Sequence, residues 1–98
     1  DVERASEHYH KQLKFIQEMA ASDPMNAQFR RNEAVALINV GDIEARSGKA
    51  AKSLEHYTEA LRIREQLASA AKEDTTIARE LAEIEAKLQA TKEHITHK

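Results

Sequence analysis

Histidine is the first residue type in this chain that could do chemistry. The chain has five histidines and no cysteine, so a metal site would need imidazole and carboxylate ligands. His8 and His10 point about 200° apart on a helix and therefore cannot share one ion. His94 and His97, with Glu93 beside them, could share one, but histidines in the last turn of a helix are also favoured by its negative C-terminal end. We adopt that second interpretation and predict no metal site and no cofactor.

The sequence contains no recognisable arrangement of catalytic residues. The chain has no Gly-rich phosphate loop, and no Ser stands in the setting of a nucleophile. Glu55 and Glu59 lie one helical turn apart and could act as paired carboxylates. Such a pair is more typical of the solvated edge of a charged helix. The sequence therefore predicts a protein that is not an enzyme and has no catalytic residues.

Composition limits the classes of structure and partner. The 98 residues suit one domain. The composition favours long helices over sheet, because 41% of the residues are hydrophobic, 33% are charged, and there are only two Gly and one Pro. The net charge is −2 with acids and bases interleaved, which argues against a nucleic-acid partner. No apolar run approaches the roughly 18 residues that cross a bilayer, so we predict no membrane contact. The absence of cysteine fits a cytoplasmic location.

The apolar spacing predicts an all-α fold of four antiparallel helices. Their expected bounds are residues 3–21, 27–46, 50–72 and 75–96. Asn26 is the expected N-cap of the second helix, Gly48 supplies the left-handed residue after its end, and Asp74 or Thr75 caps the fourth. The short connections make successive helices antiparallel neighbours.

A segment of the chain occurs twice at an offset of 48 residues. Glu-His-Tyr at 7–9 returns at 55–57, and the same offset relates Leu13 to Leu61, Ala20 to Ala68, Arg31 to Arg79 and Ala34 to Ala82. A fixed period of this size is typical of stacked helical repeats, which bury one face and present another to a partner. We expect His8 and His56 to flank the neighbouring tyrosines in packing. Because the chain begins inside one copy, we expect it to be a fragment of a longer protein, with 1–98 as one repeat domain.

The second predicted helix has an apolar and a polar side. The apolar side holds Ala34, Leu37, Ile38, Gly41 and Ala45, and the polar side holds Asn32, Asn39, Asp42 and Arg46 with Val35 among them. Glycine inside a helix costs up to about 1 kcal/mol relative to alanine. Gly41 therefore predicts that another helix backbone approaches closely there; the alternative is a simple weak point in the helix.

Residues 34–61 place small and large residues at fixed offsets: Leu37, Val40, Gly41, Gly48, Tyr57, Ala60 and Leu61. In this pattern the segment resembles the tetratricopeptide repeat, a pair of helices. Ser53, Glu44 and Glu65 depart from the pattern, and the period of 48 exceeds the family norm of about 34. The chain looks like the long-helix variety found in tandem in large bacterial signalling proteins.

The resemblance implies a non-enzymatic protein–protein interaction module. The groove lined by the first helix of each pair would hold a partner peptide or another domain of the same polypeptide. The predicted partner-binding residues are the polar side of the second helix: Asn32, Asn39, Asp42 and Arg46. Asparagine can bond a peptide backbone and arginine a carboxylate. The alternative is an ordinary solvated face.

The residues are compatible with two other functions. The runner-up is a structural bundle that self-associates into a homodimer through an uncovered face of the first helix, formed by Leu13, Phe15, Ile16 and Met19. A repeat that faces DNA or RNA is the third, and the balance of charge argues against it.

Overall fold

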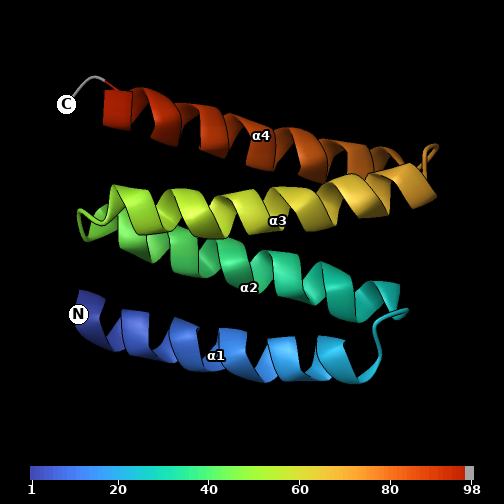
Figure 1. The fold of residues 1–98 in the computed structure, drawn as a ribbon, viewed down its shortest axis with the longest axis horizontal. Coiled ribbons are helices and arrows are strands. Elements are labelled where there is room, and N and C mark those ends of the chain that lie inside the picture. Colours follow the sequence, from blue (N-terminus) through green and yellow to red (C-terminus); the bar gives the residue numbers. More distant parts are fainter. Residues whose placement is uncertain (97–98) are drawn as a thin grey trace.

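The chain forms four antiparallel α-helices (Figure 1). The computed structural model describes residues 1–96, with α1 at Val2–Ser22, α2 at Ala27–Arg46, α3 at Ala50–Ala70 and α4 at Thr75–Thr96. In this part of the chain there is no strand, and each helix packs against the next along the sequence. The all-α prediction is confirmed.

The helix ends follow the local signals in the sequence. The Asn26 side chain accepts a hydrogen bond from the Phe29 backbone N–H at 3.0 Å, and Gly48 has a φ of 77° after the end of α2. The Asp74 carboxylate accepts from the backbone N–H groups of Thr76 and Ile77, so Asp74 rather than Thr75 caps α4. Helix α3 ends at Ala70, two residues before the predicted end, because the chain must turn to present that cap.

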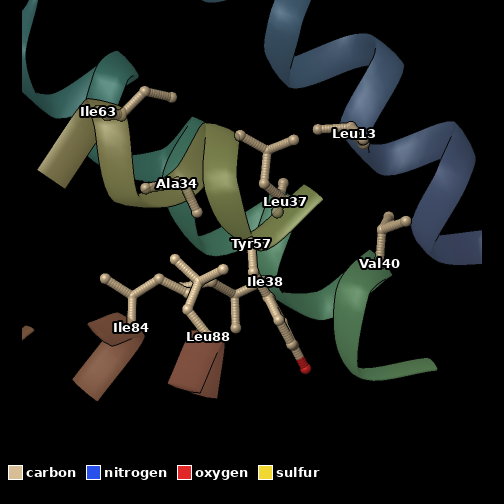
Figure 2. Close-up of a cluster of buried hydrophobic side chains, with 11 residues drawn as sticks. Leu13, Ala34, Leu37, Ile38, Val40, Tyr57, Ile63, Ile84 and Leu88 are labelled. Carbon is tan, nitrogen blue, oxygen red and sulfur yellow. The ribbon is translucent and has the colours of Figure 1, made fainter. Parts of the chain in front are cut away.

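The core centres on α2, which is buried on two sides. Leu13 of α1 reaches the buried cluster from one side, and Ile84 and Leu88 of α4 reach it from another (Figure 2). The predicted apolar side of α2 is confirmed except for Ala45, which is exposed. A second side of α2 is buried as well, since α1 covers it; its residues are Ala36, Val40, Ile43 and Glu44. A helical-wheel projection of α2 alone could not show that other helices pack on two of its sides.

Gly41 lies at a close contact, but a ring rather than a helix backbone makes it. A Cβ atom built on Gly41 would lie 2.5 Å from Cε1 of Tyr57, well inside contact distance. The Ser53 hydroxyl donates to the Gly41 carbonyl at 2.8 Å in the same buried place. The prediction of a close approach at Gly41 is confirmed, and the nearest atoms there belong to the Tyr57 ring rather than to a helix backbone. The tyrosine of α3 uses the space that a side chain would fill.

Candidate functional site

A groove between α1 and α2 is the candidate binding site. It holds a hollow of about 170 Å³, lined from α1 by Gln12 and Ile16 and from α2 by Asn32, Val35, Ala36 and Asn39. Two of the four predicted partner-binding residues, Asn32 and Asn39, therefore share this groove. Gln12 was not among the predicted residues, because nothing in the sequence of one helix indicates which residues of a neighbouring helix will lie beside it.

The groove combines an apolar floor with neutral polar groups. Val35 remains 44% exposed beside Ile16 and Ala36, and carboxamides lie around them. Each carboxamide can both donate and accept hydrogen bonds, and none carries a charge. The Gln28 side chain donates to the side-chain oxygen Oδ1 of Asn32 at 3.0 Å. Within residues 1–96 the Asn39 side chain makes no hydrogen bond, so its donors and acceptor are available.

Asp42 is occupied by contacts within the protein. Its carboxylate accepts a short hydrogen bond from the Tyr57 hydroxyl and pairs with Lys87 Nζ at 3.0 Å. The Lys87 ammonium also lies 5.9 Å from the centre of the Tyr57 ring. The pKa of Tyr57 is raised, chiefly by burial and secondly by the hydrogen bond to Asp42. Asp42 therefore joins α2 to α3 and α4, and a partner would have to compete for it.

Arg46 lies apart from the asparagines. It is exposed at the end of α2 and lines a separate, open hollow of about 620 Å³ beside the first turns of α1. Glu3 and Glu7 of α1 line the same hollow with Lys49, so charges of both signs surround it. The four predicted residues thus follow one side of α2, but the structure brings only the two asparagines into one groove.

The surroundings of His8 agree with the sequence prediction, whereas those of His56 do not. The ring of His8 lies 5.5 Å from that of Tyr9, as expected, but His56 bonds to Glu44 of α2 instead of flanking Tyr57. His10 of α1 approaches the same carboxylate. The one indication of this cluster in the sequence is Glu44, which stands where the tetratricopeptide pattern has an aromatic residue. The structure buries this glutamate almost fully.

The remaining candidates for chemistry are solvated. Glu55, Glu59 and His94 are exposed, and the expected partner of His94, His97, lies outside the described residues. Among residues 1–96 no group of three or more His, Asp or Glu is arranged to hold a metal ion. None of the helices in this range has both the length and the apolar character that crossing a membrane requires.

Comparisons with known proteins found no relative of this chain. No family model, no curated protein and no solved structure matches the chain. The similarity to the tetratricopeptide repeat therefore stays a prediction that rests on the residues named above.

Proposed function

We propose that this protein is a non-enzymatic interaction module, similar to a tetratricopeptide repeat, that binds an extended peptide segment in the groove between α1 and α2. The segment belongs to a partner protein or to another domain of the same polypeptide. The observation that carries the proposal is the set of three carboxamides, Gln12, Asn32 and Asn39, around an apolar floor. A cytoplasmic setting within a larger signalling protein belongs to the same proposal and rests on the sequence resemblance.

The spacing of the asparagines suits an extended chain. Asn32 and Asn39 are two helical turns apart, which places them about 10 Å apart along the axis of α2. That length corresponds to about three residues of extended peptide at roughly 3.3 Å each. The carboxamides can bond successive peptide groups, and an apolar side chain of the ligand can cover Val35 and Ile16.

A peptide selection tests the proposal. A random linear-peptide library is selected on the wild type, and the peptides obtained are measured by fluorescence anisotropy against variants. The double variant with Asn32→Ala and Asn39→Ala should weaken binding at least tenfold, about 1.4 kcal/mol, because two sets of hydrogen bonds are lost. Its melting temperature should stay near that of the wild type, since Asn32 is exposed and the half-buried Asn39 makes no side-chain hydrogen bond within residues 1–96.

Gln89→Ala is the matched control. Gln89 is an exposed carboxamide on α4 that donates to Glu93 of its own helix. It should leave peptide binding unchanged. Failure to select any peptide, or peptides that bind the double variant as well as the wild type, would show that the groove is an ordinary solvated face.

Self-association is the second candidate, and Phe15 favours it. This side chain is 62% exposed on α1 although it is large and apolar. The uncovered face is smaller than predicted, because Leu13 is buried in the core and Ile16 packs against it, while Met19 is half-buried. What remains for a homodimer contact is the outer side of α1 around Phe15.

A further inference from the structure

The carboxylate of Glu44 in α2 lies between two histidines from different helices. His56 Nδ1 of α3 is 2.5 Å from one carboxylate oxygen, and His10 Nε2 of α1 is 4.0 Å from the other. The Glu44 side chain is 4% exposed, whereas those of His10 and His56 are 47% and 22% exposed. The two imidazole rings are 6.4 Å apart and nearly perpendicular. One buried carboxylate thus connects α1, α2 and α3.

Neighbouring hydrogen bonds determine where the protons lie. A carboxylate only accepts, so His56 Nδ1 carries the proton of its bond to Glu44. His10 Nδ1 lies 2.8 Å from the Ser6 carbonyl oxygen, which also only accepts, with the Ser6 hydroxyl at 3.3 Å. Neutral His10 therefore has its proton on Nδ1 and a lone pair on Nε2, the atom that faces Glu44. Only the imidazolium form of His10 attracts the carboxylate.

No other cation compensates Glu44. Within residues 1–96 no Lys or Arg side chain pairs with it. The contact between Lys49 and Glu44 is a hydrogen bond from the Lys49 backbone N–H to the Glu44 backbone carbonyl. The other titratable groups at this corner are Tyr57 of α3 and Asp42 of α2. Burial, followed by the hydrogen bond to Asp42, raises the pKa of Tyr57 and keeps its hydroxyl protonated. Lys87 of α4 pairs with Asp42. The balance of charge around Glu44 thus depends on the two histidines.

We propose that His10, Glu44 and His56 form a proton-dependent clasp that holds α1 against α2 and α3. With both histidines protonated, the buried carboxylate has an imidazolium on each side. When they lose their protons, the lone pair of His10 faces a buried negative charge, and the contact of α1 is weakened. Histidine is the side chain that commonly changes charge between pH 5 and 8, so the clasp is tighter at the acid end of that range and looser at its alkaline end.

Thermal unfolding at about pH 6 and about pH 8, in buffers with a chelator, tests the clasp. The melting temperature of the wild type should fall from the lower to the higher pH. In His10→Gln, which cannot become charged, and in Glu44→Gln, which removes the carboxylate, that fall should be smaller by about 4 °C or more. His10 is half-exposed, so its variant should fold.

His8→Gln is the matched control, since His8 lies on the same helix and contacts Tyr9 rather than Glu44. It should keep the pH dependence of the wild type. Amide hydrogen exchange, corrected for intrinsic rates, should show that protection lost at the higher pH is lost first in α1 and not in α4. A wild type whose melting temperature is the same at both pH values, or a His10→Gln variant that keeps the full dependence, would overturn the proposal. So would a His8→Gln variant that loses it, or an equal loss of protection in α1 and α4.

Discussion

At the scale of single residues, the ring of Tyr57 packs directly against Gly41. The ring of Tyr57 occupies the space beside Gly41, and its hydroxyl is held by Asp42, so the ring has little freedom to move. Its apolar part lies in the core and its polar end at the edge (Figure 2). The position of one aromatic side chain thus explains why a helix interior contains glycine.

Gly41→Ala is expected to destabilise the protein. Alanine gains up to about 1 kcal/mol of helix propensity, but its Cβ would overlap the buried ring, and overpacking typically costs about 1–3 kcal/mol. Urea unfolding of the variant should show a net loss of about 1 kcal/mol. In a Tyr57→Leu background the same substitution should be neutral or stabilising, because the overlapping ring is gone. An equal loss in both backgrounds would mean that the ring is not what Gly41 accommodates.

Tyr57 should make stability depend on alkaline pH. Burial and the bond to Asp42 raise its pKa in the folded protein above the value of about 10 for an unfolded tyrosine. The folded state therefore holds the proton more tightly, so its contribution is complete below about pH 10 and decreases as the pH rises further. In a Tyr9→Phe variant, phenolate absorbance reports Tyr57 alone. It should appear only above about pH 10 and together with loss of the helical circular dichroism signal. A phenolate signal near pH 10 from a protein that is still folded would contradict this.

At the scale of elements, polar contacts fix how α4 lies on the other helices. Arg31 of α2 binds the Glu80 carboxylate of α4 through two nitrogens, at 2.8 and 3.2 Å. Arg64 of α3 is buried and donates to the backbone carbonyl of Glu80 at 2.8 Å. One residue of α4 is thus held by arginines from two other helices, α2 and α3.

The Arg31–Glu80 pair should couple more strongly than a pair within one helix. The bonds are bidentate and Glu80 is mostly buried, whereas Arg79 and Glu83 of α4 pair at 3.8 Å with both side chains exposed. Double-mutant cycles with Arg→Met and Glu→Gln substitutions should give a coupling energy about twice as large for Arg31–Glu80. About 1 M salt should reduce the exposed pair more. Equal coupling in the two cycles would show that the contact does not position α4.

At the scale of the whole molecule, the two ends of the helical array differ. The outer side of α1 presents the exposed ring of Phe15, whereas α4 presents charged residues, including Arg79, Glu83 and Glu93. A large exposed aromatic ring favours association, although exposed charges such as Lys11, Lys14 and Glu18 lie on α1 as well. Self-association, if it occurs, is therefore expected through α1.

Sedimentation measurements separate the two candidate functions. If the α1 face mediates a homodimer, Phe15→Glu should convert a dimer into a monomer while peptide binding in the groove is retained, because Phe15 does not line it. Val2→Glu, which adds the same charge at another exposed apolar position of α1, is the control and should leave the dimer intact. A wild type that stays monomeric at high concentration would remove the self-association hypothesis.

Much of the fold was predictable from the sequence because its determinants are local. The period of the apolar residues, the carboxamide of Asn26 and the positive φ of Gly48 act over a few neighbouring residues, so they specified four helices and most of their ends. The end of α3 was misplaced because its last residues form a turn that serves the next helix, which no periodic pattern records.

The sequence by itself determined the helices, their antiparallel order and the polar side of α2. Only the tertiary structure decided that α2 is covered on two sides, that the ring of Tyr57 fills the space at Gly41, and that Gln12 joins Asn32 and Asn39 in one groove. It also decided that His10 and His56 meet at Glu44. A helical wheel gives the direction of each side chain around its own axis. Which side chains meet depends on the distance and rotation between axes, and the packing of the whole core sets these.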